Sequence, residues 1–472
     1  MRALERGEDL DHNAQRLEPY RATTGGPVRR TRWVVVMVAL AAGSASLVPS
    51  SAVAAPGQSQ PLQDTEVGVS KDTIRIAVIA DVDNPVRPGL FQGVVSGVRA
   101  FAKFINGRGG LAGRKVQVDF IDSHLSADEA RNALIRACQE DFAIVGTTAL
   151  FLNDIGPMTG CQDKAGGATG LPDVPLVQTE ESHQCSPVSY PVLANQLVCS
   201  TRDQHPQTYF VKSGQVRYFL KHFKNLHGVY LIPSDLRSTV NATTPLARGE
   251  QQLGVKSDGE IKISGLATQS DYTPIAQTMR QRDSTYAESI SDYKSSVFLR
   301  REAKVQGITS VKVWGCALQC YDAKFLSEGG ADVDGHYTAL FFIPFEEAGR
   351  NKSVAAYLKN VGGKANADGF GAQAWTAGLF FRDVVDNVAK ADGKNGLTRG
   401  RFLEEAAKVH DFTASVDGDA MLGPTDVGGH KVSPCFLLMQ DKGNRDVRVF
   451  PKQANTFDCN PKNVFTIKLD QS

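Results

Sequence analysis

The stretch Ile74-Arg-Ile-Ala-Val-Ile-Ala-Asp81 decides the fold, because it is a short apolar run rich in β-branched residues, and such runs form buried strands. An amphipathic helix is predicted to follow, since apolar side chains recur every three or four residues, at Phe91, Val94, Val95, Val98, Phe101 and Ile105. The pattern continues with strands at 115–122 and 143–146, separated by a helix at 127–138. Repeated strand–helix units require a parallel sheet with right-handed crossovers. The sequence therefore predicts an α/β fold that binds ligands at the carboxyl ends of its strands.

A second series of strand–helix units follows an irregular stretch, 151–208, whose one strand candidate is Val174–Thr179. The strands of this series are predicted at 228–233, 260–264, 286–290, 311–316 and 337–344. Helices are predicted at 214–223, 244–253, 272–282, 295–306, 353–361, 372–391 and 401–409, and a hairpin at 431–451. Two successive series of this size imply two Rossmann-like lobes, each with its own parallel sheet.

The N-terminal region, 1–54, predicts export. A polar, basic start precedes an apolar core at 33–48, and Ala52-Val53-Ala54 fits a signal-peptidase site. The uninterrupted apolar run is ten residues long, which is short for a membrane span. The alternative is an uncleaved segment that tethers the protein to the membrane. Residues 55–70 are polar and aperiodic, so we expect a linker there.

The charge balance argues against two classes of partner. Removing residues 1–54 takes away seven of the 52 basic and five of the 51 acidic side chains, which leaves a net charge of −1. A near-neutral protein has no electrostatic attraction for nucleic acid or for an anionic membrane surface. We therefore expect no nucleic-acid partner.

All eight cysteines follow the predicted cleavage site, and an even number in an exported protein favours disulfides. The sequence does not fix their pairing. Short loops favour Cys435–Cys459 and bonds among Cys161, Cys185 and Cys199, and Cys316 would reach Cys320 if the segment between them is helical. The alternative is a zinc site, but the spacing of Cys316, Cys320, His183 and Cys185 matches no standard ligand pattern. No metal and no cofactor is predicted.

Three motifs resemble one known family. The first spans 69–122 and includes Ile105-Asn106 followed by Gly109-Gly110-Leu-Ala-Gly-Arg-Lys115 before a strand. The second is the helix Gly369–Asp383, and the third is Leu422-Gly-Pro-Thr425 with Gly428-Gly429. Together they resemble type I periplasmic solute-binding proteins, in the leucine/branched-chain amino-acid group that serves ABC transporters. The matches are scattered from about 69 to 451, over most of the chain.

The resemblance implies two lobes joined by three hinge crossings, near 208–211, Phe345 and 417–422, with the solute held in the cleft between the lobes. Lobe I would comprise 71–208 and 346–418, and lobe II would comprise 209–345 and 419–472. Closure of two rigid lobes on a hinge buries a small ligand, whose contacts then favour the closed state.

The resemblance also implies the ligand contacts, which are hydroxyls and amides after the strands of lobe I and side chains at the strand ends of lobe II. The matching residues here are Asp81, Thr147, Thr148, Thr179, Ser182, Asp235, Ser289 and Tyr321. Hydroxyls can donate to a carboxylate without burying an opposing charge.

Each of these residues also has a structural interpretation. Thr147 and Thr148 would cap the helix that follows them, Asp235 would cap a helix at 238–253, and Tyr321 would pack at a helix start. The chain departs from the family at one point. The acidic group that pairs with an amino-acid ammonium has no counterpart between Cys316 and Tyr321.

The sequence therefore predicts an extracytoplasmic solute-binding protein, not an enzyme, that captures a small polar solute such as an amino acid or an amide. Its partners, by resemblance, are an ABC permease and its ATPase, and we expect a monomer. One alternative is a membrane-tethered sensor of the same fold. Another is an exported enzyme, but the sequence contains no Gly-x-Ser-x-Gly and no His-Glu-x-x-His motif.

Overall fold

The computed structural model describes residues 60–84, 88–193, 196–234, 237–289 and 292–470. The predicted signal peptide with its apolar core, residues 55–59 of the linker and Asp235 lie outside these ranges. No described helix combines the length and the apolar character that crossing a membrane requires.

The first sheet is parallel, as predicted, and has the strand order β2-β1-β3-β4. Its strands are β1 (Thr73–Ala80), β2 (Lys115–Asp122), β3 (Ala143–Val145) and β4 (Asp173–Val174). Both faces of β1 are covered. Ile76 and Val78 pack against α1 (Gln92–Gly107) and α11 (Gly369–Asp392), whereas Ala77 and Ile79 pack against α2 (Ala127–Glu140). Two-sided burial explains why β1 is an unbroken apolar run.

The second sheet has seven strands in the order β12-β11-β10-β9-β8-β6-β7. They are β6 (His227–Pro233), β7 (Lys256–Ile263), β8 (Tyr286–Ser289), β9 (Val313–Cys316), β10 (Tyr337–Leu340), β11 (Leu437–Asp441) and β12 (Asp446–Phe450). Strands β6–β10 are parallel, and the predicted terminal hairpin adds β11 and β12 antiparallel to them. The parallel part follows the same order as the first sheet, with β6 in the place of β1.

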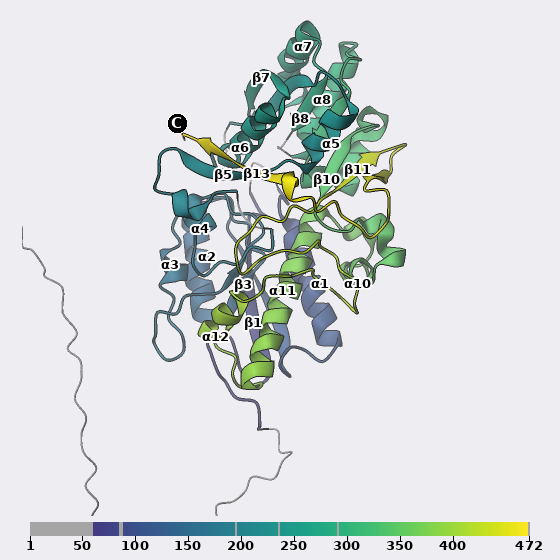
Figure 1. Cartoon of the computed structure of the whole chain (residues 1–472). Coiled ribbons are helices and arrows are strands. Elements are labelled where there is room, and N and C mark those ends of the chain that lie inside the picture. The colour runs from purple at the N-terminus through teal and green to yellow at the C-terminus, as the bar shows by residue number, and fades with distance from the viewer. Residues whose placement is uncertain (1–59, 85–87, 194–195, 235–236, 290–291, 471–472) are drawn as a thin grey trace, which may run out of the picture. The chain divides into compact units, whose positions relative to one another are not determined.

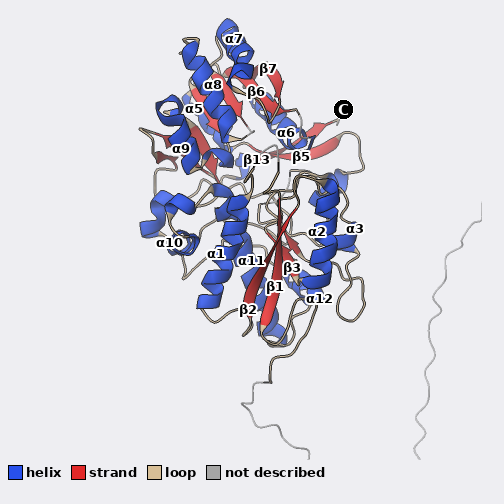
Figure 2. Cartoon of the chain, turned by 180° about the vertical axis from the view of Figure 1, so that it is seen from behind, coloured by secondary structure: helices blue, strands red, loops and turns tan. Residues whose placement is uncertain are grey.

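Helices cover both sheets (Figures 1 and 2). Those of the second sheet are α5 (Gly214–His222), α6 (Arg237–Leu253), α7 (Thr273–Arg282), α8 (Tyr293–Val305) and α9 (Ala323–Gly329). The remaining helices are α3 (Gly156–Thr159), α4 (Glu181–Gln184), α10 (Lys352–Val361) and α12 (Arg399–Ala406), with 3-10 turns η1 (Cys199–Thr201), η2 (Gln269–Tyr272), η3 (Leu318–Cys320), η4 (Gly330–Val333), η5 (Phe345–Arg350), η6 (Lys364–Asn366) and η7 (Pro461–Asn463).

The chain passes between the two sheets three times. It leaves the first sheet between β4 and β6, returns between β10 and α10, which packs in the first core, and crosses again between α12 and β11. Backbone pairing involves all three passages: the second pairs with the third, and the first pairs with the C-terminal strand. An isolated antiparallel bridge joins Phe342 to Leu422, and β5 (Gln207–Lys212) pairs with β13 (Val464–Leu469). The sequence analysis predicted neither β5 nor β13 as a strand.

The helices α1 and α11 lie unusually close because small residues line their contact. A Cβ placed on Gly97 would stand 2.2 Å from the carbonyl oxygen of Gly371, so only glycine fits there. Trp375 of α11 is fully buried, and its ring lies 5.1 Å from that of Phe104. This tight pair forms the rigid centre of the first core.

All eight cysteines form disulfides, and the structure corrects one expectation. Cys185–Cys199, Cys316–Cys320 and Cys435–Cys459 agree with the pairs favoured by short loops, but Cys161 bonds Cys138 rather than Cys185 or Cys199. The C-terminal end of α2 carries Cys138 to the loop that holds Cys161, and their separation of 23 residues is close to the 24 of Cys435–Cys459, so loop length did not distinguish this pair from its alternatives.

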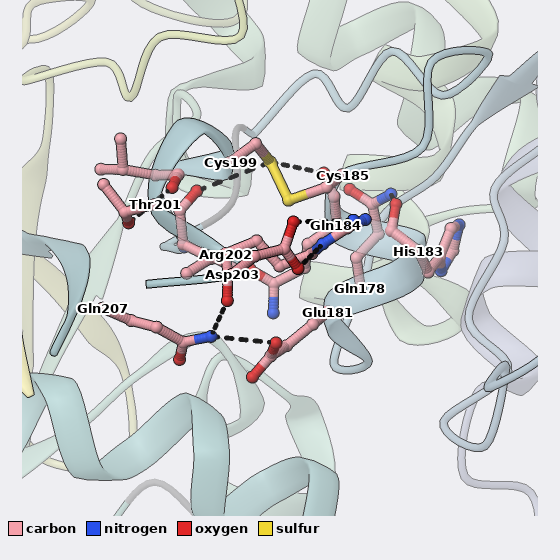
Figure 3. The surroundings of a disulfide bond; sticks show 12 residues. Gln178, Glu181, His183, Gln184, Cys185, Cys199, Thr201, Arg202, Asp203 and Gln207 are labelled. Atoms are coloured by element: carbon pink, nitrogen blue, oxygen red, sulfur yellow. Dashed lines mark hydrogen bonds and ion pairs between the residues drawn. A yellow bond between two sulfur atoms is a disulfide. The ribbon is translucent and has the colours of Figure 1, made fainter. Parts of the chain in front are cut away.

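The Cys185–Cys199 bond closes the loop between α4 and β5 (Figure 3). Beside it, the Gln207 amide donates to the Glu181 carboxylate at 3.1 Å and to the Arg202 carbonyl at 2.6 Å. These contacts attach the start of β5 to the first sheet's loops.

The predicted strand Val174–Thr179 is wrong in extent, because β4 ends at Val174. Pro175 follows it and has no N–H to donate to a ladder. The irregular segment after it makes other contacts, described below.

Arg399 is a fully buried cation that donates hydrogen bonds to the segments joined by the Cys138–Cys161 disulfide. Its five N–H groups are all used. They donate to the carbonyls of Cys138, Asp141, Phe142 and Gln162, at 2.6–3.3 Å, and to Cys161 Sγ at 3.0 Å. Desolvation by burial lowers its pKa from the usual arginine value. A planar group with five fixed donors is therefore required at this position.

We predict that Arg399→Lys lowers the free energy of unfolding by about 2–4 kcal/mol, because an ammonium cannot satisfy five diverging acceptors. Urea unfolding checks this. The matched control is Arg401→Lys, two residues away, whose ion pairs with Asp392 and Glu404 are at the surface, screened by solvent, and expected to contribute much less. Equal losses in the two variants would contradict the role given to Arg399.

Candidate functional site

The carboxyl edges of the two parallel sheets define where a ligand is expected. In each sheet the strand order reverses beside the first strand, between β1 and β3 and between β6 and β8. Crossover helices leave on opposite faces at such a point, which opens a crevice at the carboxyl edge. Four of the eight predicted site residues, Asp81, Thr147, Thr148 and Ser289, end or closely follow strands at these edges.

Asp81, directly after β1, is buried and fully engaged. Its carboxylate accepts hydrogen bonds from Ser123 Oγ at 2.6 Å and from the amides of Leu125 and Leu150 at 2.8 Å each. Burial raises the pKa of this carboxyl above its ordinary value. Asp81 thus holds two loops at the edge of the first sheet, and its oxygens are occupied.

Thr147 belongs to a buried polar cluster centred on Asp173. The Asp173 carboxylate accepts from Thr147 Oγ1 at 2.5 Å and from Ser189 Oγ at 2.7 Å, and it lies 2.8 Å from His183 Nε2. Both Asp173 and His183 are shielded from solvent. The sequence analysis missed this cluster because its members come from four separate segments.

Thr179 and Ser182 also bind the loop that follows β3. Thr179 Oγ1 donates to the Leu150 carbonyl at 2.9 Å, and Ser182 Oγ donates to the Asn153 carbonyl at 3.1 Å. Together with Asp81 they fix residues 150–153. The structure therefore brings the predicted residues of the first sheet together, but most of their polar atoms are used to shape the edge.

Thr148 is different. Its backbone N–H donates to the Ile79 carbonyl at 2.9 Å, but its buried hydroxyl has no partner among the described residues. The interpretation of Thr147 and Thr148 as helix caps is wrong, because the next helix, α3, begins only at Gly156. A buried hydroxyl without a partner is costly and calls for an explanation.

Ser289 carries a similar hydroxyl in the second sheet. It ends β8, which occupies the place of β3, and its buried hydroxyl also has no partner within the described ranges. The amide of Gln319 lies 3.4 Å from the Ser289 carbonyl and connects this strand end to η3. Two hydroxyls without a described partner thus lie on corresponding strands of the two sheets, Ser289 at the end of β8 and Thr148 three residues after β3.

Tyr321 packs inside the protein. Its ring lies 4.8 Å from that of Phe345, and its hydroxyl accepts from the Phe345 amide at 2.6 Å and donates to Glu346 at 2.7 Å. Desolvation raises its pKa well above the ordinary value. The structural interpretation of Tyr321, a packed aromatic next to a helix start, is the one that these contacts support.

A buried pair of acidic residues, Glu288 on β8 and Glu250 on α6, was not predicted from the sequence. The Tyr286 hydroxyl is within hydrogen-bonding distance of both Glu250, at 2.8 Å, and Glu288, and Gln215 donates to Glu288 at 2.9 Å. A phenol has one proton, so it can donate to only one of the two carboxyls, and the second must itself carry a proton to bond the phenol oxygen. Burial raises the pKa of both glutamates.

The residues proposed for a zinc site do not converge as free ligands, because Cys185 is bonded to Cys199 and Cys316 to Cys320. A different group does converge. Among the described residues, His336 lies with Cys316 and Cys320 so that their ligand atoms are within 4.8 Å of one another. Because the two sulfurs are joined, neither is a thiolate, which is the form that binds zinc.

Two open hollows of about 510 and 270 Å³ lie beside β7 and α7, lined in part by Ile263, Leu266 and Tyr272. They contain none of the predicted site residues.

The two doubly wound sheets and the three passages of the chain between them define a two-lobed fold of the solute-binding type. The sequence profile of the periplasmic binding protein family matches residues 73–445, so the chain belongs to that family. Comparison with curated proteins by sequence gives no match.

Solved structures of this family share the fold at low identity. A leucine-binding protein from Thermotoga maritima superimposes with a TM-score of 0.59 at 16% identity, covering 80% of this chain and 97% of the other. A branched-chain amino-acid ABC transporter protein from Thermus thermophilus with bound valine gives 0.62 at 11% identity, covering 80% and 95%. A fatty acid ABC transporter substrate-binding protein from Thermomonospora curvata gives 0.60 at 14% identity, covering 83% and 97%. The periplasmic binding protein family predicted from the motifs is confirmed, and the solved structures show its fold.

We predict that Glu288→Gln flattens the dependence of stability on pH. A carboxyl whose pKa is raised in the folded state loses stability as pH rises from its unfolded value, 4.5, through its folded value. The titratable groups facing Glu288 are Glu250 on α6, Tyr286 beside it on β8, and Tyr230 on β6.

The melting temperature of the wild type should therefore fall more between about pH 5 and about pH 8 than that of the variant. Glu260→Gln is the matched control, because Glu260 is partly exposed and paired with Arg248 at 2.6 Å. Parallel profiles for wild type and Glu288→Gln would contradict the shared-proton interpretation.

Proposed function

We propose that this protein is an exported solute-binding subunit of an ABC importer, and that it captures a small polar solute between two lobes. One observation carries the proposal. Thr148, just after β3, and Ser289, at the end of the corresponding strand β8, are buried hydroxyls without a partner among the described residues, within a fold whose carboxyl edges bind ligands. Closure around a solute would supply their missing partners.

We propose the lobe boundaries 71–208 with 346–418 for lobe I, and 209–345 with 419–472 for lobe II. Support comes from sheet membership, since β1–β4 precede the first boundary and β6–β10 follow it. The second and third boundaries fall beside the bridge between Phe342 and Leu422. Paired backbone at these points would act as the hinge on which the lobes close.

The importer role follows from the family rather than from any residue of the site. A permease and an ATPase are the proposed partners, and the protein would act as a monomer that delivers its solute and does no chemistry. The solved relatives carry leucine, valine or fatty acid in their names, so the solute class is open among amino acids, amides and acids. The residues proposed to contact it are Thr148 and Ser289, with Asp235 as a further candidate.

Ligand binding should raise the melting temperature. A solute at 100 times its dissociation constant stabilises the folded state by about 2.7 kcal/mol. We expect at least one compound among amino acids, amides, polyols and short organic acids to give a saturable shift. Absence of any shift, together with turnover of one of these compounds, would replace the binder with an enzyme.

Two isosteric variants separate a ligand contact from a structural one. Thr148→Val should weaken binding of that compound by roughly fivefold or more without lowering the stability of the free protein, because the hydroxyl has no partner among the described residues and its burial is itself unfavourable. Thr179→Val should instead lower the free energy of unfolding by about 1 kcal/mol, because it removes the bond to the Leu150 carbonyl. Titration calorimetry and urea unfolding measure the two effects.

Export predicts a defined mature N-terminus. We expect cleavage after Ala54, so that secreted or periplasmic protein begins at Ala55 when it is sequenced or weighed intact. Recovery of the unprocessed chain in the membrane fraction would establish the tethered sensor instead.

A further inference from the structure

Lys212 ends β5, the strand through which the chain enters the second sheet. Alternate side chains of β5 point to opposite sides. Val211 packs so closely against α6 that a Cβ on Gly249 would lie 2.5 Å from it, so Lys212 projects from the other side. There its ammonium nitrogen stands 4.3 Å above the ring of Phe341.

Two independent contacts place this ammonium at the carboxyl edge of the seven-stranded sheet. Phe341 directly follows the last residue of β10, a parallel strand. Gly214, two residues after Lys212, packs on Phe436, where a Cβ would lie 2.4 Å from the ring. Phe436 precedes Leu437, which pairs with Leu340 at the end of β10. Lys212 therefore lies on the same edge as Ser289.

The ammonium of Lys212 has no counter-ion among the described residues. It makes no hydrogen bond or ion pair there, and the side chain is half-buried. Desolvation by burial lowers its pKa to about 8. A partly desolvated charge without a partner is unfavourable, and an anion placed beside it would remove that cost.

The N-terminus of α5 would also attract an anion. This nine-residue helix begins at Gly214, and Ser213 makes no capping hydrogen bond to its first turn. The Ser213 hydroxyl instead bonds the Lys462 carbonyl and the Arg217 side chain. Uncapped N–H groups carry partial positive charge, so they reinforce the ammonium of Lys212.

We propose that Lys212 binds the acidic group of the solute, and that the solute is an organic carboxylate which needs no ammonium group. This inference rests on the proposed solute-binding function and specifies its ligand. The sequence supports a solute without an ammonium group, because no acidic residue lies between Cys316 and Tyr321 to bind one. Lys212 would pair with the carboxylate while the unpaired hydroxyls of Thr148 and Ser289 complete its hydrogen bonds.

The experiment uses matched acids and amides on the full mature chain. Titration calorimetry measures straight-chain alkanoates from acetate to decanoate, the corresponding alkanamides, leucine and leucinamide. The proteins are wild type, Lys212→Met, Lys212→Arg and the control Lys468→Met. Methionine keeps the apolar stem over Phe341 without the charge. Lys468 is an exposed lysine on β13, the strand paired with β5.

We expect wild type to bind at least one alkanoate more tightly than its amide. Lys212→Met should weaken that alkanoate by roughly 10- to 100-fold and leave the amide within about twofold, because a charge-assisted hydrogen bond is lost. Lys212→Arg should retain most of the affinity, and Lys468→Met all of it. Circular dichroism confirms that each variant is folded.

Several results would overturn the inference. If amides or leucinamide bind as well as the acids, or if Lys212→Met binds the alkanoate as wild type does, Lys212 is not the anion site, although solute binding stands. A requirement for leucine over every alkanoate excludes the ammonium-free ligand. If no compound binds wild type, the proposed function fails as well.

Discussion

Burial of the first strand of each sheet on both faces is the constraint on which the rest of the structure depends. Ile76 and Val78 of β1 need one layer of helices and Ala77 and Ile79 need another. In the second sheet, Tyr230 packs with α5 and α6 while Val229 and Leu231 pack with α7. Because helices close both faces, only the edges where strands end remain for a ligand. The location of the site therefore follows from the fold and does not depend on any particular polar residue.

Polar groups at these edges divide into those that build the edge and those left without partners. Asp81 and Asp173 each accept three short contacts from neighbouring loops, so their burial is compensated. Thr148, Ser289 and Lys212 receive no such compensation from the described residues. Unpaired buried polar groups lower stability, and proteins retain them where another molecule completes the bonds.

The scaffold beneath the site relies on buried charges that are satisfied by backbone. Arg399 uses all five N–H groups on carbonyls and a disulfide sulfur, and Arg114 donates similarly to the carbonyls of Ser70, Gln63 and Lys394. Such contacts connect segments that are hundreds of residues apart. Rigid lobes are useful in this family, because closure then occurs at the hinge and not by deformation of the edges.

The amino-acid sequence determined the architecture, since apolar periodicity is local. The strand predicted at 74–81 occupies 73–80, and most of the alternating helices and strands fall within a few residues of their predicted bounds. The family followed from motifs that are also local, such as the glycine-rich run at 109–113. Among the disulfides, Cys316–Cys320 and Cys435–Cys459 were accessible for the same reason, because their partners are near in the chain.

Only the tertiary structure decided which polar residues are free. Thr147 and Thr148 are adjacent and identical in sequence, but Asp173, 26 residues from Thr147, takes the first hydroxyl and no described group takes the second. Strand β5 was missed because its partner β13 lies some 250 residues away, and with it Lys212. Hydrogen-bond partners are set by packing between distant segments, which no local pattern encodes.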